Sequence, residues 1–134
     1  MNEQVERIVS QDTLLALVVR AGYEPAETTF LTDDDETFQL GFFVYPKNGV
    51  AVAHTHPEVE RHLTRTAELL LVRKGRCVLE LYTEDGEPVT ERRLDAGDAV
   101  YLAAGGHGLR TEEDTVVLTL KQGPYGGPDE KRRF

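Results

Sequence analysis

Short apolar runs recur along this chain, and their regularity constrains the fold more than any other feature. Each run is rich in Val, Leu or aromatic residues and ends near glycine, proline, asparagine or aspartate, which form tight turns. The runs cover residues 14–19, 38–45, 50–55, 68–73, 76–82, 89–94, 99–103 and 115–121. Because no helical pattern alternates with them, the sequence predicts an all-β sandwich or barrel and disfavours a doubly wound α/β fold.

The 134 residues are enough for a single domain with its own core. We expect that one domain to cover residues 1–134, with the core fold over about 38–121 and a tail over 122–134. Residues 1–10 fit either a short helix or an arm, and the acidic stretch 32–37 predicts a solvent-exposed turn. The tail is rich in Gly and Pro, so it is either disordered or folded back over the core with Tyr125 and Phe134 as anchors.

Charge and cysteine content narrow the classes of partner. The net charge of −9 is opposite to that of most nucleic-acid binders and disfavours an anionic membrane surface. No apolar run approaches the ~20 residues that span a bilayer, and the first ten residues do not resemble a secretory signal. The single cysteine, Cys77, excludes an intramolecular disulfide and is expected in the core. We therefore expect a cytoplasmic protein without nucleic-acid or membrane partners.

Two of the four histidines stand two positions apart: His54 lies in the run 50–55, and His56 directly follows that run. In a strand these two side chains point to the same face, with Val50 and Val52 behind them. Two imidazoles on one face can bind a single metal ion. An H-x-H pair alone is weak evidence, because a hydrogen-bonded surface pair has the same spacing.

Glu68 and His107 are the other candidates for such a site. Glu68 opens a strongly apolar run, where an unpaired buried carboxylate is costly, so we expect it at a rim or bound to a cation. Both faces of that run are apolar, which predicts a second sheet or a partner subunit on its outer side. His107 lies among glycines after the run 99–103, so we expect a loop that either holds it rigidly for a ligand or turns it to water.

These residues resemble the cupin family. Its first motif reads roughly G-x5-H-x-H-x3or4-E-x6-G, and here Gly49 leads into His54-Thr55-His56, with Glu68 six residues before Gly75. Its second motif reads roughly G-x5-P-x-G-x2-H-x3-N, and here the stretch from Gly97 reaches His107. The resemblance covers about residues 38–121. The end of the chain is also similar to that of a group of small bacterial cupins, some of them associated with surface-polysaccharide loci.

The resemblance implies a double-stranded β-helix, that is, a jelly-roll barrel. It also implies that His54, His56, Glu68 and His107 converge on one divalent transition metal ion, with coordination positions left for water or a small-molecule ligand. The sequence does not choose among iron, manganese, nickel and zinc. Cupins are often homodimers, which agrees with the two apolar faces of the run 68–73.

This chain departs from the family pattern mainly in one place. Eleven residues separate His56 from Glu68, where the family usually has three or four. The insertion 57–67 contains His62, which is an alternative ligand in place of Glu68. In the second motif, Ala103 replaces the proline and Thr111 stands at the asparagine position.

Three functions remain open from the sequence. The first is a metal-dependent enzyme acting on a small polar substrate such as a sugar, keto or carboxylate compound, an oxygenase or an isomerase. The second is a metal-free nucleotide-sugar isomerase or epimerase, with a histidine base, a tyrosine acid, and Arg61, Arg65 or Arg110 on the diphosphate. The third is a non-enzymatic module that binds a small ligand. The sequence offers Tyr45, Tyr101 and Glu68 as bases without choosing one.

Overall fold

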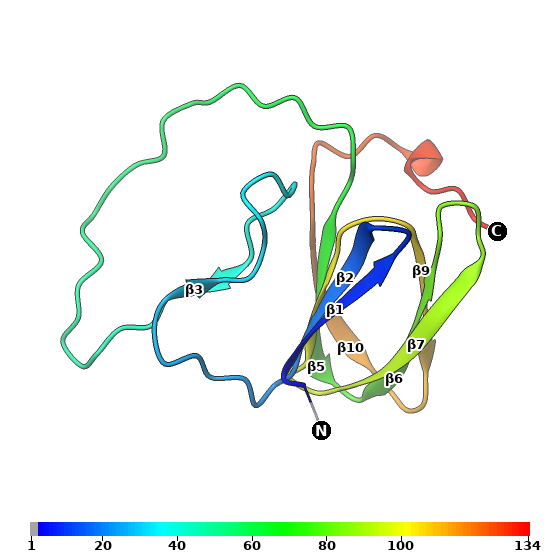
Figure 1. Ribbon diagram of the computed structural model, residues 1–134, viewed down its shortest axis with the longest axis horizontal. Coiled ribbons are helices and arrows are strands. Elements are labelled where there is room, and N and C mark those ends of the chain that lie inside the picture. The colour runs from blue at the N-terminus through cyan, green and yellow to red at the C-terminus, as the bar shows by residue number, and fades with distance from the viewer. Residues whose placement is uncertain (1–2) are drawn as a thin grey trace. The chain divides into compact units, whose positions relative to one another are not determined.

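The computed structural model describes residues 3–134, in which the chain forms two units (Figure 1). The larger unit combines residues 3–23 with Thr66–Phe134, and the smaller unit is Glu24–Arg65. Each unit is described by itself below. Among the described residues no helix is long and apolar enough to cross a membrane.

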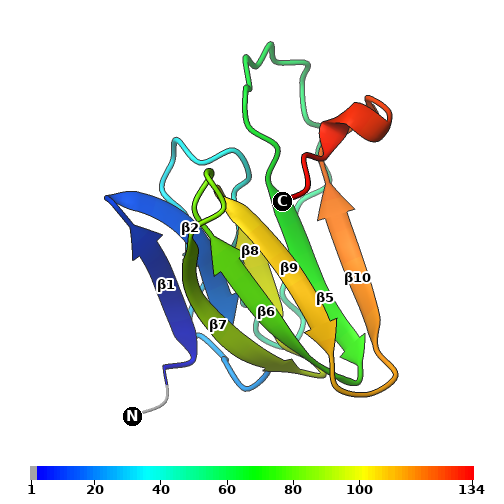
Figure 2. The same ribbon diagram turned by 90° about the vertical axis from the view of Figure 1, so that its right-hand side faces the viewer.

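The larger unit contains two antiparallel sheets (Figure 2). The five-stranded sheet has the order β1-β2-β8-β5-β10, with β1 Val5–Ser10, β2 Thr13–Val19, β8 Ala99–Leu102, β5 Glu68–Lys74 and β10 Val116–Lys121. The three-stranded sheet has the order β7-β6-β9, with β7 Pro88–Asp95, β6 Arg76–Tyr82 and β9 Gly106–Thr111. A 3₁₀ turn, η1 (Pro128–Glu130), lies in the tail.

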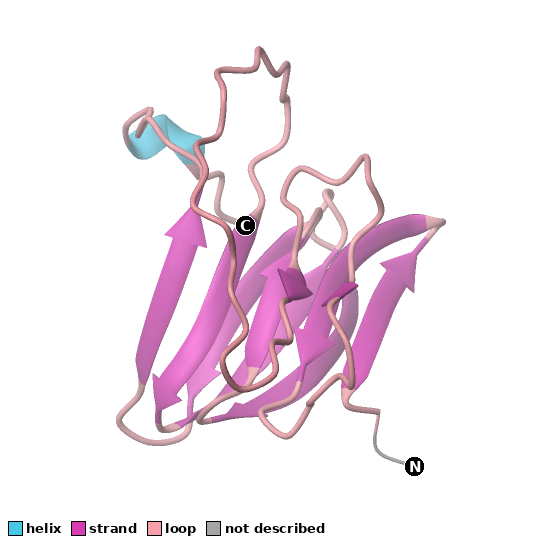
Figure 3. Cartoon of the chain, turned by 90° about the vertical axis from the view of Figure 1, so that its left-hand side faces the viewer, coloured by secondary structure: helices cyan, strands magenta, loops and turns pink. Residues whose placement is uncertain are grey.

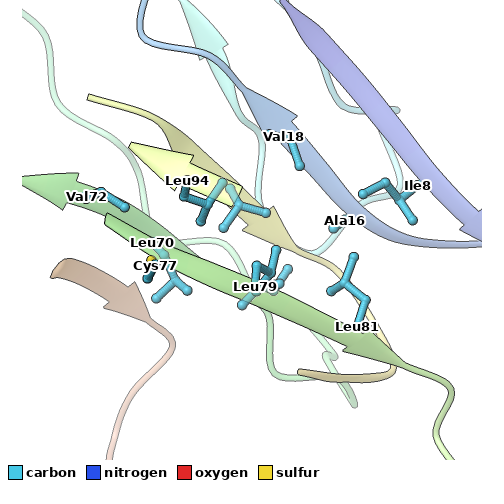
Figure 4. Packing of buried hydrophobic residues seen from close by; sticks show 11 residues of the cluster. Ile8, Ala16, Val18, Leu70, Val72, Cys77, Leu79, Leu81 and Leu94 are labelled. Atoms are coloured by element: carbon cyan, nitrogen blue, oxygen red, sulfur yellow. The ribbon is translucent and has the colours of Figure 1, made fainter. Parts of the chain in front are cut away.

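The inner faces of the two sheets share one apolar core (Figure 4). Alternate residues along each strand face this core, as the two-residue period of a strand requires. The buried cluster comprises Ile8, Ala16, Val18, Leu70, Val72, Cys77, Leu79, Leu81, Leu94, Val100 and Leu102. Cys77 is fully buried among these residues, so the expected core role of this cysteine is confirmed.

The all-β prediction is confirmed, but the closed barrel is not. The five-stranded sheet has β1 and β10 at its edges, the three-stranded sheet has β7 and β9, and no strand pairing between residues 3 and 134 joins these edges. The two sheets are therefore layers packed over a common core, as in a β-sandwich. Six of the predicted strands are present here with bounds close to those expected: β2, β5, β6, β7, β8 and β10.

The helix or arm expected over residues 1–10 is wrong for the part that the structure describes. Residues Val5–Ser10 form the strand β1, which pairs antiparallel with β2. Gln11 and Asp12 between the two strands have φ values of 51° and 62°. Two consecutive residues with positive φ make a tight hairpin turn whose twist matches that of the strands. The partner strand therefore overrides the helical spacing of the apolar residues.

The smaller unit contains only one short hairpin, β3 (Thr29–Phe30) with β4 (Gly41–Phe42), as Figure 3 shows. The acidic stretch 32–37 lies in the connection between these strands, so the predicted turn is confirmed. The expected strand over 38–45 shrinks to β4, and the expected strand over 50–55 is absent. Val50 and Val52 are each more than three-quarters exposed. Without a partner strand, the backbone of 50–55 has no ladder of hydrogen bonds to hold it extended.

An ion pair ties the two sheets of the larger unit together and gives stability a dependence on pH. Arg92 on β7 donates from Nε to Glu6 Oε1 at 2.9 Å and from Nη2 to Glu6 Oε2 at 2.6 Å. The hydrogen bond from Arg92 is the main reason that the pKa of Glu6 on β1 lies below its ordinary 4.5. A lowered pKa stabilises the fold above the unfolded value, and this contribution is lost as the pH falls below 4.5.

We expect Glu6→Gln to lower the free energy of unfolding at pH 7 and to weaken its decline between pH 5 and pH 3. Glutamine cannot form the charged fork with Arg92, and it does not titrate in this range. Urea unfolding at several pH values measures both effects, with the exposed Glu3→Gln as the matched control. Equal pH profiles for Glu6→Gln and the unmodified chain would contradict the assignment.

Candidate functional site

An open cavity of about 1080 Å³ lies at one end of the sandwich. Residues at strand ends line it: Glu68 at the start of β5, Tyr82 at the end of β6, His107 near the start of β9 and Lys121 at the end of β10. These ends meet because β10 runs antiparallel to β5, and β9 runs antiparallel to β6. Below the cavity, Leu70 and Leu102 belong to the apolar core.

Glu68 is the best-connected polar side chain in this cavity. It lies on the same face of β5 as Leu70 and Val72, as the sequence predicts, and its side chain is 20% exposed. Thr119 Oγ1 donates to Glu68 Oε2 at 2.6 Å, and His107 Nε2 lies 3.4 Å from Glu68 Oε1. The carboxylate is therefore held from two strands in two different sheets.

The environment of Glu68 favours its charged form. The hydrogen bond from His107 is the largest cause, and it outweighs the opposing effect of burial. The hydroxyl of Thr119 and the charge of Lys121 act in the same direction, and the pKa of Glu68 falls to about 2. The carboxylate is consequently ionised at neutral pH, which is the state that a metal ion or a protonated imidazole requires.

His107 is in a strand, so the expectation of a loop histidine is wrong. It is the second residue of β9 and pairs with Leu81 of β6. Leu81 belongs to the core, and directly paired residues share a face, so the register directs His107 toward the inner side of its sheet. The side chain is 36% exposed at the open end of the core. The hydrogen-bonded ladder with β6 fixes the backbone of His107. The glycines around His107 suggested a loop, so the sequence did not predict this strand.

His54 and His56 lie in the smaller unit, outside any strand, and both are exposed. Their rings are nevertheless close, with centroids 5.1 Å apart and planes at 72°. His54 Nδ1 is 2.7 Å from the carbonyl oxygen of Val52. The prediction that these two side chains share a strand face is wrong, because the strand is absent. His62 lies in the same irregular segment and is also exposed.

The separation of Glu68 and His107 can be compared with that of two ligands on one divalent metal ion. Two donors about 2.1 Å from an ion, at a tetrahedral angle, lie about 3.4 Å from each other. The distance between His107 Nε2 and Glu68 Oε1 is 3.4 Å. Across residues 3–134, however, no three His, Cys, Asp or Glu side chains form a group that could hold a metal ion. The structure thus contains two of the four expected donors as a close pair.

The sequence did not indicate several of the residues that line this cavity. Thr119 and Lys121 belong to the predicted run 115–121, but nothing in the sequence shows that this strand pairs with β5 and brings both to Glu68. Tyr82 was expected only as the last residue of a strand. Arg110, one of the arginines expected on a diphosphate, does not line this cavity and lies 3.3 Å from Glu91 and 3.9 Å from Glu80.

The tail also reaches the cavity. Phe134 packs its ring against Tyr82, with centroids 5.3 Å apart and planes at 69°. Of the two expected anchors, Phe134 forms this one ring contact while 69% exposed, and Tyr125 is 73% exposed. Lys131, Arg132 and Arg133 line the cavity next to it in sequence.

No protein-family model matches the chain, and neither the curated proteins nor the solved structures contain a significant match.

Proposed function

We propose that this chain is a metal-binding protein of the cupin type, with one divalent transition metal ion held in the cavity of the larger unit. Glu68 and His107 are the donors on which the proposal depends. The distance of 3.4 Å between His107 Nε2 and Glu68 Oε1 is the single observation that carries it. We further propose that the protein is an enzyme that acts on a small polar compound, such as a sugar, keto or carboxylate compound.

His54 and His56 complete the proposed donor set, as the family resemblance implies. Both histidines lie in the smaller unit, and their ring centroids are 5.1 Å apart. Two imidazoles this close can bind a single metal ion.

The jelly-roll fold is part of this proposal. It rests on the two sheets and on their free edges at β9 and β10. Eight-stranded jelly rolls consist of two such sheets, each completed by strands distant in sequence. A bound divalent ion would polarise an oxygen of the ligand or, if it were iron, activate molecular oxygen.

Elemental analysis of protein purified without chelator or nickel resin tests the proposal. We expect about one iron, manganese, nickel or zinc ion per chain, and a large loss of that metal in His107→Ala and in His54→Ala. His62→Ala is the matched control: it removes a histidine from the same exposed segment as His54 and keeps the metal. Loss in His62→Ala and retention in Glu68→Gln would instead assign the fourth ligand to His62.

Absence of metal from the purified protein, together with no uptake of any of the four ions, would overturn the proposal. Unchanged metal content in His107→Ala would overturn the assignment of the site. Circular dichroism of each variant, compared with the unmodified chain, separates loss of the ligand from loss of the fold.

A second function is favoured by one observation, namely that Tyr82 and His107 line the same cavity. A histidine oriented by a carboxylate, together with a tyrosine, is a suitable base and acid for the metal-free isomerase or epimerase. Saturable binding of a nucleotide sugar by metal-free protein, weakened in both Tyr82→Phe and His107→Ala, would favour this function. A bound ligand without turnover in either state of the protein would favour the non-enzymatic module.

We also propose that the protein is cytoplasmic and forms a homodimer. Cys77 is the single cysteine of the sequence and is buried, which is compatible with a reducing compartment. Leu118 and Leu120 on β10 pair with Leu71 and Leu69 of β5 and are each more than half exposed. This apolar face supports a partner subunit, and the mass of the protein in solution tests that prediction.

A further inference from the structure

We propose that residues 128–134 of the tail are part of the ligand site, and that this site takes small molecules that have a carboxylate or phosphate group. The inference deepens the proposed function, on which it rests for the identity of the cavity. It begins from the arrangement of charges. Lys121, Lys131, Arg132 and Arg133 all line the cavity that contains Glu68 and His107.

Four of the 15 lysines and arginines of the sequence line this cavity, and so do four of its 24 acids, namely Glu68, Glu80, Glu84 and Glu130. What distinguishes the cations is that three of them are consecutive in the tail. A chain with a net charge of −9 repels anions in general, so an anionic ligand needs a local region of positive potential. The tail supplies three of these four cations within three consecutive residues.

The side chains of Lys131, Arg132 and Arg133 have no ion pair or hydrogen bond to any other described residue. Most of the acids in the same lining, by contrast, are already held by other groups. Glu68 is bound by His107 and Thr119, and Glu84 Oε1 accepts a hydrogen bond from the backbone N–H of Gly105 at 3.1 Å. Glu80 lies 3.9 Å from Arg110. The tail cations therefore remain available to an oxyanion from solution.

One ring contact of Phe134, which is 69% exposed, places these cations beside the cavity. Its ring contacts Tyr82 and lies over Gly86 and Gly106. A Cβ atom at Gly106 would collide with the Phe134 ring, and one at Gly86 would come within 3.3 Å of it. Two glycines thus leave room for one aromatic side chain at the edge of the cavity. Because Phe134 directly follows Arg133, this contact keeps the cationic residues beside the cavity.

Guanidinium groups suit this ligand class. They present paired N–H donors that match the geometry of carboxylate and phosphate oxygens. An anionic group bound by Arg132 and Arg133 would leave the rest of a small molecule facing Glu68 and His107 in the same cavity. The tail therefore selects the charge of the ligand, and the strand residues act on its remaining part.

Isothermal titration calorimetry of metal-free protein tests the inference, with inorganic phosphate, pyrophosphate and malonate as separate probes. We expect at least one of them to bind, with an affinity that falls as salt increases. Arg132→Gln/Arg133→Gln is expected to lower that affinity about tenfold, since each charge-assisted contact at a partly exposed site contributes modestly. The matched control, Arg73→Gln/Lys74→Gln, removes two exposed cations at the other end of β5 and leaves the affinity within about twofold.

A second pair of variants tests the anchor. Phe134→Ala is expected to weaken binding of the same probe severalfold, whereas Tyr125→Ala, which removes an exposed aromatic from the same tail, leaves it unchanged. Failure of all three probes to bind, or equal losses in the tail variant and in the Arg73/Lys74 control, would overturn the inference. So would unchanged affinity in Arg132→Gln/Arg133→Gln.

Metal content distinguishes this inference from the proposed function. The tail variants retain the metal of the unmodified chain, because neither Arg132 nor Arg133 is a proposed donor. Absence of metal from every protein would overturn the proposed function while leaving the calorimetric result in force. A phosphate response without a malonate response would restrict the ligand class to phosphate compounds.

Discussion

Leu79→Ala is expected to lower the free energy of unfolding by about 3 kcal/mol, because it removes buried methyl groups from the centre of the core. Leu79 is fully buried on β6, the middle strand of the three-stranded sheet, and packs among residues of the facing sheet. Since 1.4 kcal/mol is about tenfold in an equilibrium constant, the unfolded fraction rises more than about a hundredfold. Urea unfolding measures the change.

Leu118→Ala is the control for this substitution. Leu118 is 54% exposed on the edge strand β10, so the same truncation creates no closed cavity there. We expect it to cost less than about 1 kcal/mol. Equal losses for the two leucine variants would show that the two sheets do not share the core described above.

Asp98→Ala is expected to destabilise the fold by a similar amount, about 3 kcal/mol. The carboxylate of Asp98 lies at the end of the sandwich where β7 turns into β8, and its side chain is 7% exposed. It accepts hydrogen bonds from the backbone N–H groups of Ala21 and Asp95, both at 2.8 Å, and from Arg20 Nη1 at 3.1 Å. Alanine leaves the two backbone N–H groups without this acceptor, whereas Arg20 Nη1 still donates to the carbonyl oxygen of Arg93 at 2.7 Å.

Asp95→Ala is the matched control, three residues away in the same turn. The Asp95 side chain is 55% exposed and forms a surface ion pair with Arg76, whose loss has little effect on stability because water screens both charges. Asp98→Asn should lie between the two alanine variants, because an amide oxygen still accepts from part of the donor set. Chemical denaturation at pH 7 ranks the three. A loss for Asp98→Ala no larger than that for Asp95→Ala would contradict the role of this carboxylate.

Most strands of the sandwich could be predicted because the pattern of apolar residues within each segment is enough to indicate a strand. In β6, for example, Cys77, Leu79 and Leu81 alternate with residues of the other face, and the bounds Arg76–Tyr82 are the predicted ones. The pairing of strands could not be predicted in the same way. It depends on contacts between distant parts of the sequence, such as Lys121 of β10 opposite Glu68 of β5.

The candidate site likewise has one part that the local sequence predicts and one part that depends on contacts between distant segments. The position of Glu68 at the head of an apolar strand followed from the cost of burying an unpaired carboxylate, and its partners His107 and Thr119 now account for that cost. His54 and His56 illustrate the opposite case. Their alternation predicted a strand over 50–55, but alternation expresses a preference for one buried face and does not supply the neighbouring strand that a ladder needs.

The position of β8 inside the five-stranded sheet has a consequence for how the chain is made. β8 pairs with β2 on one side and β5 on the other, so the β1–β2 hairpin cannot join the sheet until residue 102 has been synthesised. The 83 residues from Val19 to Leu102 take roughly 4 to 17 s to translate at ordinary rates. During that interval the apolar strand Thr13–Val19 has β1 beside it but lacks its second partner, β8. In a nascent chain of this protein the other edge of this hydrophobic strand therefore stays unpaired until most of the chain has been made.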